Sequence, residues 1–191
     1  MNTMETFRQR RSIRAIKPDP IPDEMIRQVI QAGILAPSGS NRQPWHFYVV
    51  KENRRGEMMA CMEKGIEAAR QSGGRLGSSE NSARIMSQAP VTVFIFNMQQ
   101  ENKPGPYGPG DLLRNSVDVQ SIGACIENML LAAVDLGLGG LWICDVFMAY
   151  NELCEWLGET HQMVAAVSFG YPDESPNARP RKSLDEVTTW L

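Results

Sequence analysis

The pattern of apolar and polar positions along the chain predicts amphipathic helices that alternate with short apolar strands. Apolar or small residues at positions 26, 29, 30, 33 and 34 recur with helical spacing, so a helix is expected from Pro22 until Pro37 stops it. The longest helix is expected over residues 116–136, with Gly137 as its left-handed cap. Further helices are expected at residues 2–10, where Asn2 and Glu5 have the spacing of a capping box, at residues 54–70 and 81–88, and at residues 151–158, where Gly158 stops the helix. Strands are expected at residues 45–52, 90–96, 139–146 and 161–170.

Two segments interrupt this pattern and are expected to be loops. Residues 71–81 and 98–111 are rich in glycine, proline and polar side chains and show no apolar period. Helices that alternate with four strands indicate an α/β or α+β sandwich, although periodicity does not give the strand order. A chain of 191 residues is expected to fold as one domain, residues 1–191.

Composition narrows the class of protein. A formal net charge of −3 and a pI near 5.5 argue against a protein whose whole surface binds nucleic acid. The four cysteines form no C-x-x-C pair, and with two histidines a zinc site has little support. The N-terminus shows no apolar signal segment, so we expect a reduced, cytoplasmic location. Aspartates and glycines interrupt the apolar run at residues 129–150, so a membrane span is not expected.

Two basic clusters are candidates for binding an anion. The first lies within residues 8–17, which contain no acidic side chain, and the second lies within residues 177–182. Arginine forks suit phosphate oxygens, and the two clusters could converge on one phosphate. A solvated basic surface and a DNA-contacting arm are the alternatives. Neither G-x-G-x-x-G nor a P-loop motif occurs, so side chains would hold any phosphate.

The loop at residues 36–47, APSGSNRQPWHF, carries more polar side chains than a helix–strand connection needs. Ser38, Ser40, Asn41 and Gln43 offer donors and acceptors that suit an aromatic heterocycle with carbonyls and ring nitrogens. The tryptophan and histidine that follow fit structural roles better. No nucleophile–base pair or paired-carboxylate motif is visible, so any difficult chemistry would be carried by a cofactor.

These stretches, in this order, resemble the FMN-dependent nitroreductase family over nearly the whole chain. R-R-S-x-R at residues 10–14 and A-P-S-x-x-N-x-Q-P-W at residues 36–45 carry the resemblance, together with residues 118–143 and the C-terminal stretches FGYPDE and RPRKSLDEV. The resemblance implies an α+β fold, an α/β/α sandwich with a mixed, mainly antiparallel sheet, in an intertwined homodimer. It also implies FMN at the subunit interface, with no catalytic side chain and no metal.

By this resemblance, each part of FMN has its own set of contacts. The phosphate would be held by Arg10, Arg11, Ser12, Arg179 and Arg181. The polar edge of the flavin would face Arg14, Asn81 and Arg84. The flavin of the partner subunit would contact Pro37, Ser38, Ser40 and Asn41, with Gln43 supporting that loop. The central ring would lie beside the segment WIC, which includes Ile143 and Cys144.

The chain also departs from the family pattern. Some members have Glu-Gly where this chain has Cys144 and Asp145. The variable segments at about residues 54–80 and 98–115 are expected to shape the substrate pocket.

The implied activity is a ping-pong reduction. NADH or NADPH would give a hydride to N5 of the flavin and leave, and a small-molecule electron acceptor such as a nitroaromatic or quinone would take its place. A flavin-binding protein of the same fold with another role, such as flavin fragmentation, sensing or storage, is the alternative. Neither nucleic acid nor a membrane is expected as a partner.

Overall fold

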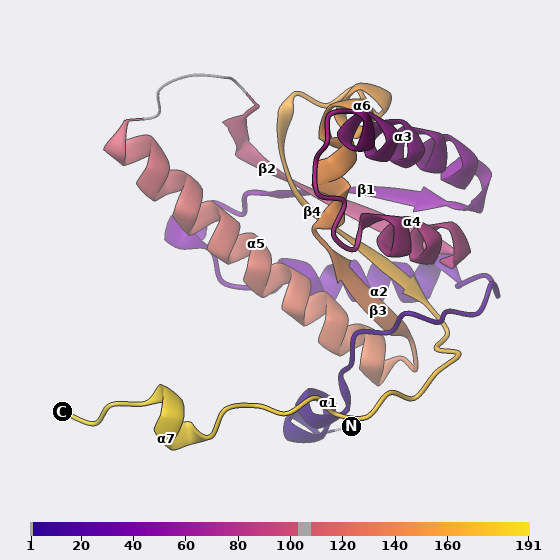
Figure 1. Cartoon of the computed structure of the whole chain (residues 1–191). Helices are drawn as coiled ribbons and strands as arrows, with labels where there is room; N and C mark the ends of the chain where they lie inside the picture. Colours follow the sequence, from indigo (N-terminus) through magenta and orange to yellow (C-terminus); the bar gives the residue numbers. More distant parts are fainter. Residues whose placement is uncertain (1, 103–107) are drawn as a thin grey trace.

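In the computed structural model, which describes residues 2–102 and 108–191, four strands form one sheet with helices on both faces (Figure 1). The helices are α1 (Thr3–Gln9), α2 (Asp23–Ile34), α3 (Glu52–Gln71), α4 (Ser79–Gln88), α5 (Pro109–Asp135), α6 (Tyr150–Leu157) and α7 (Leu184–Val187). The strands are β1 (Trp45–Lys51), β2 (Val91–Glu101), β3 (Gly139–Ile143) and β4 (His161–Gly170). Two 3-10 turns are also present, η1 (Gly39–Asn41) and η2 (Asp145–Ala149).

The sheet is built from antiparallel pairs in the strand order β1-β2-β4-β3. In its centre, Val93 of β2 lies between Val49 of β1 and Val167 of β4. One isolated parallel bridge joins Ser12 to Gly140 and attaches the N-terminal segment beside β3. The arginines around Ser12 are therefore held near one edge of the sheet.

Apolar side chains fill two cores, one on each face of the sheet. α2 and α5 cover one face, where Val29, Ile126 and Met129 are fully buried. α3, α4 and α6 cover the other face, where Met62 and Phe94 are fully buried. Each such side chain contributes about 1.5–3 kcal/mol by leaving water, so both faces of the central strands must be apolar. The expected α+β class and α/β/α layering are confirmed.

The structure confirms several predicted boundaries and shows the local contacts on which those predictions were based. The side chain of Asn2 accepts a hydrogen bond from the N–H of Glu5 at 2.9 Å, and α1 begins at the next residue. β4 has the predicted bounds. Gly137 and Gly158 adopt the left-handed conformation, with φ of 76° and 67°, just after α5 and α6.

The bounds predicted for the loop at residues 98–111 are wrong at both ends. Residues 103–107 of this loop lie outside the described residues. β2 continues to Glu101, which pairs with His161 of β4. α5 begins at Pro109 instead of residue 116, because proline suits the first turn of a helix and the carboxylate of Asp111 accepts the N–H of Gly108 at 3.1 Å.

Three other predicted elements have different bounds. The strand expected at residues 139–146 ends at Ile143, because the chain turns into η2. The helices expected at residues 54–70 and 81–88 begin earlier, at Glu52 and Ser79. Local patterns give the type of each element more reliably than its ends.

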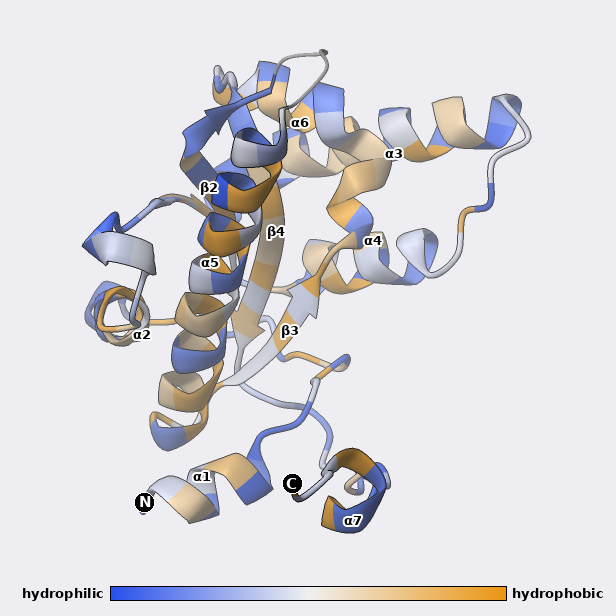
Figure 2. Cartoon of the chain, turned by 90° about the vertical axis from the view of Figure 1, so that its left-hand side faces the viewer, coloured by the Kyte–Doolittle hydropathy of each residue, from blue (hydrophilic) through white to orange (hydrophobic). Residues whose placement is uncertain are grey.

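α5, with 27 residues, is the longest helix of the described chain and lies on one face of the sheet. Among the described residues, it is the one helix long and apolar enough to cross a membrane by length and composition, a test that core helices also pass. Its Ile122, Ile126 and Met129 are fully buried against the sheet and α2. Figure 2 shows polar and apolar residues mixed along it, as expected for a helix with one face on a core. In this fold α5 is a core helix.

Candidate functional site

The N-terminal segment and the start of the C-terminal tail run side by side near α1 (Figure 1). The N–H of Asp173 donates to the carbonyl oxygen of Ala15 at 2.9 Å. The carboxylate of Glu174 accepts hydrogen bonds from the backbone N–H groups of Arg14 and Ala15. This pairing brings residues 10–14 and the tail beyond Glu174 to one pocket.

This arginine pocket has a volume of about 650 Å³. Ser12 and one carboxylate, that of Glu127, line it together with six arginines: Arg8, Arg10, Arg11, Arg14, Arg179 and Arg181. Guanidinium groups bind phosphate oxygens through paired N–H donors. The structure therefore brings both basic clusters of the sequence together, and the excess of positive charge suits an anion.

The arginines of this pocket are held in different ways. Nε of Arg10 lies 3.1 Å from Oε1 of Glu127, so this carboxylate offsets part of its charge. Nη1 of Arg11 donates to the carbonyl oxygens of Arg8 and Arg10, at 2.6 Å and 2.8 Å. Nε of Arg11 is buried and has no hydrogen-bond partner among the described residues. A buried donor of this kind is costly alone and suits a bound anion.

A second pocket, of about 370 Å³, adjoins the first through Arg14, which lines both. Asn81, Ile143 and Cys144 also line it. Arg84 lies on the exposed side of α4, outside this pocket, and its guanidinium donates to Oδ1 of Asn81 at 2.8 Å. Four of the expected flavin contacts thus lie together, and Arg84 reaches the pocket only through Asn81.

Asp145 joins the end of β3 to the start of α4. Its Oδ2 accepts hydrogen bonds from the hydroxyl groups of Ser78, at 2.7 Å, and Ser82. These bonds hold Asn81 and the backbone of Cys144 together in one wall of the second pocket. A role of this kind leaves no signal in the sequence, because the serines and the aspartate lie 67 and 63 residues apart.

A third pocket, of about 440 Å³, shares Trp142 and Cys144 with the second. Trp142 is 38% exposed, and Phe147 stacks on Tyr150 with ring centroids 5.9 Å apart. Burial, and then the charge of Asp145, raises the pKa of the Cys144 thiol, so it stays protonated near neutral pH. The pocket offers aromatic surface and a neutral thiol. Part of the variable segment expected at residues 98–115 also lines it.

The loop at residues 37–43 lies apart from these three pockets. None of them is lined by the expected flavin contacts Pro37, Ser38, Ser40, Asn41 and Gln43. Ser40, Asn41 and Gln43 have positive φ values of 52°, 54° and 48°. Left-handed backbone costs a non-glycine residue on the order of 1 kcal/mol. Within one chain, this loop does not join the arginine pocket, and contacts elsewhere must hold its shape.

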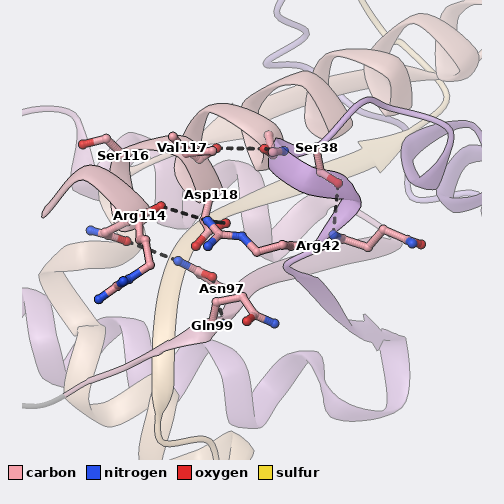
Figure 3. A network of polar contacts seen from close by, with 12 residues as sticks. Ser38, Arg42, Asn97, Gln99, Arg114, Ser116, Val117 and Asp118 are labelled. Carbon is pink, nitrogen blue, oxygen red and sulfur yellow. Dashed lines mark hydrogen bonds and ion pairs between the residues drawn. The ribbon is translucent and has the colours of Figure 1, made fainter. Parts of the chain in front are cut away.

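Those contacts are made with α5 (Figure 3). Nη2 of Arg42 donates to Oδ1 of Asp118 at 2.6 Å, and the side chain of Asp118 is 3% exposed. The N–H of Gly39 donates to Oγ of Ser121 at 3.2 Å. Sequence reasoning missed Arg42, Asp118 and Ser121 because these pairs lie 76 and 82 residues apart.

Taken together, the arginine pocket suits an anion, and the two adjoining pockets at the end of β3 offer polar and aromatic side chains. The sequence model described as Nitroreductase family matches residues 7–171. The chain belongs to this family.

Three similar proteins illustrate the relationship. The NADPH-flavin oxidoreductase of Vibrio harveyi is 31% identical over 183 residues, which are 94% of this chain and 70% of that protein. A Desulfovibrio desulfuricans protein crystallised in complex with FMN has a TM-score of 0.74 and 27% identity, covering 100% of this chain and 98% of that one. A BluB-like flavoprotein from Clostridium difficile 630 has a TM-score of 0.77 and 25% identity, covering 100% and 99%.

Proposed function

We propose that this protein is a homodimeric, single-domain oxidoreductase that uses FMN and takes electrons from NADH or NADPH. The observation that carries the proposal is the junction at Arg14, where the arginine pocket meets the pocket beside β3. A phosphate tail and a planar ring need two neighbouring sites of this kind. The FMN-bound relative and the flavin oxidoreductase relative support the same cofactor here.

The residues that line the pockets fit FMN. The phosphate would be held by Arg10, Arg11, Ser12, Arg179 and Arg181. Arg14 and Asn81 would face the polar edge of the ring, with Arg84 orienting Asn81. The central ring would lie beside Ile143 and Cys144. The single carboxylate of Glu127 does not cancel the positive charge of six arginines.

The chemistry that bound FMN supplies is hydride and electron transfer, in ping-pong order, from NAD(P)H to a nitroaromatic, quinone or similar conjugated acceptor. The chain binds and orients the reactants. The charge of Arg14 would stabilise negative charge at the edge of the ring. Trp142 and the stacked pair Phe147 and Tyr150 would exclude water from the third pocket. Solvent would supply protons, since the raised pKa of the Cys144 thiol makes it a poor proton donor.

A second copy of the chain would complete the site. The loop at residues 37–43 lines none of the pockets of its own chain described above, so it would face the flavin of the partner. Large apolar side chains are exposed on α1 and on the tail around α7, and a dimer interface would cover them: Met4, Phe7, Leu184, Val187, Trp190 and Leu191. Sedimentation of the flavin-loaded protein should give a dimer, and a flavin-loaded monomer would contradict this part of the proposal.

Anaerobic rapid mixing tests the activity. NADH or NADPH should bleach the visible absorbance of the bound flavin, and a nitroaromatic or quinone added afterwards should restore it. Protein that stays yellow would contradict the reductase activity while preserving the cofactor assignment. Apo protein that binds no added FMN would contradict the cofactor assignment itself.

A second candidate is a flavin-binding protein with another role, such as flavin fragmentation, sensing or storage. The similarity to the BluB-like flavoprotein favours it. Mass spectrometry of the flavin after aerobic incubation with an excess of reductant separates the two. Intact FMN with turnover of the acceptor supports the reductase, and a cleaved flavin supports fragmentation.

A further inference from the structure

We propose that Arg42 and Asp118 are a positioning pair that holds the loop at residues 37–43 in the shape required to contact flavin. The inference rests on the proposed function, because that function supplies the flavin. Neither residue lines the arginine pocket or the two pockets beside β3. Their role would be to orient Ser40 and Asn41, not to touch the ligand.

The ion pair is the shortest of the hydrogen bonds described above between this loop and α5. Nη2 of Arg42 lies 2.6 Å from Oδ1 of Asp118, and the same nitrogen donates to the carbonyl oxygen of Arg114 at 3.4 Å (Figure 3). Asp118 is a buried polar residue in a helix whose other core-facing residues are mostly apolar. A carboxylate is costly to bury unless it is paired. Asp118 therefore fixes the guanidinium, and the guanidinium fixes the loop.

The loop does not hold its conformation through local bonds alone. Its internal backbone donors are the N–H groups of Asn41 and Gln43, which bind the carbonyl oxygen and hydroxyl of Ser38 at 2.9 Å and 3.0 Å, and the N–H of Arg42, which binds the carbonyl oxygen of Gly39 at 3.1 Å. Asn41 and Gln43 lie in left-handed backbone, which opposes this arrangement. Arg42 lies between these two residues. Tethering it to α5 therefore restrains the conformation on both sides.

The anchor points on α5 form one face of the helix. Arg114, Asp118 and Ser121 are spaced by four and then three residues, so they lie in one row. Oγ of Ser121 accepts the N–H of Gly39 at 3.2 Å and donates to the carbonyl oxygen of Val117 at 2.8 Å. Two successive turns of a core helix thus hold both ends of η1, and a rigid helix is a precise support for a binding loop.

The same part of α5 also borders the third pocket. Asn115 lines that pocket, and its Oδ1 accepts a hydrogen bond from Nδ2 of Asn97 at 3.2 Å. Nδ2 of Asn97 also donates to Oε1 of Gln162, another residue of that pocket, at 3.2 Å. The same stretch of α5 therefore supports both the loop at residues 37–43 and the third pocket.

The test compares Asp118→Asn with Asp23→Asn, in apo protein and in protein reconstituted with FMN. Asp23 is the matched control because it also forms an ion pair, with its Oδ1 2.5 Å from Nζ of Lys51, but both side chains are exposed. Amide hydrogen exchange of residues 38–43 in the apo protein reports on the loop alone. FMN titration and the visible circular dichroism of the bound flavin report on its effect at the site.

Asp118→Asn should speed amide exchange in the loop, weaken FMN binding by about tenfold and change the flavin spectrum, through loss of one or two oriented contacts. Asp23→Asn should change none of these. Arg42→Lys keeps the positive charge, so its loop exchange and FMN affinity should lie between those of the wild type and those of Asp118→Asn. Unchanged loop exchange in Asp118→Asn would overturn the anchoring role, and faster exchange with unchanged FMN affinity and spectrum would overturn the positioning role. Failure of the wild-type protein to bind FMN would overturn the proposed function, while the exchange data would still decide the anchoring.

Discussion

Nε of Arg10, just after α1, lies 3.1 Å from Oε1 of Glu127 on α5, and this pair places the one carboxylate of the arginine pocket against one of its cations. The side chains are 24% and 39% exposed. A partly exposed pair of this kind stabilises a fold by about 1 kcal/mol or less. Its larger consequence is electrostatic, because Glu127 competes with any bound phosphate for Arg10.

Glu127→Gln should therefore tighten FMN binding by about two- to fivefold, since it removes a negative charge beside a phosphate and releases Arg10. Titration of apo protein with FMN at low and high salt measures the change, which should shrink as salt increases. Exposed Glu63 provides the control, and Glu63→Gln should bind FMN as the wild type does. Weaker binding by Glu127→Gln would mean that Glu127 is needed to orient Arg10.

Loss of pocket arginines should remove FMN from the protein. Each charge-assisted arginine–phosphate contact is worth roughly 1.5–3 kcal/mol, so one alanine substitution should weaken FMN by about ten- to a hundredfold. Arg10→Ala combined with Arg181→Ala should purify as largely apo protein, measured by the ratio of visible to ultraviolet absorbance. Arg27→Ala, at an exposed site on α2, should keep its flavin. Normal flavin content in the double variant would refute the phosphate assignment.

Gly39 should tolerate no side chain, because the loop packs closely on α5. A Cβ at Gly39 would lie 2.2 Å from Cγ1 of Val117, so Gly39→Ala should destabilise the protein by about 1–3 kcal/mol. Gly56→Ala is the control, because nothing lies within 4 Å of its Cβ, and it should be neutral or slightly stabilising in α3. Urea unfolding measures both changes. Adding Val117→Ala should recover part of the loss in Gly39→Ala, and no recovery would point to strain elsewhere.

Glu159 should make the stability depend on pH in the acid range. Burial alone would raise its pKa, but hydrogen bonds from His161, Tyr48 and Thr160 outweigh burial and lower the pKa from 4.5 to about 2. A carboxyl whose pKa is lower in the folded state stabilises the fold above its unfolded pKa, and this contribution is lost as the pH falls from 4.5 towards 2. The shift corresponds to stabilisation on the order of 3 kcal/mol.

Glu159→Gln should therefore lower the free energy of unfolding at pH 7 and flatten its decline between about pH 5 and pH 3. Denaturant unfolding at several pH values measures this, with Glu63→Gln as the control for loss of an exposed carboxyl. Equal slopes for wild type and Glu159→Gln would show that other carboxyls control the acid sensitivity. Tyr48 offers a second check, since burial and then its bond to Glu159 raise its pKa, and Glu159→Gln should lower it.

The sequence by itself determined the elements that depend on neighbouring residues. The Asn2 cap, the left-handed Gly137 and Gly158, and the bounds of β4 follow from contacts within a few residues, so a local pattern records them. The type of each element and the sandwich class follow from the same periodicity. The charge pattern marked both arginine clusters, and the family resemblance then implied that they bind a phosphate.

Tertiary structure alone decided where those residues meet. β2 reaches Glu101 because a strand partner, His161, satisfies its backbone, and no local signal contains that information. The arginine clusters share a pocket because Glu174 binds the backbone at Arg14, 160 residues away. Arg42 and Asp118 also meet across the fold. The periodicity of a sequence reflects interactions between residues that are close along the chain. A binding site, in contrast, joins groups that only tertiary packing brings together.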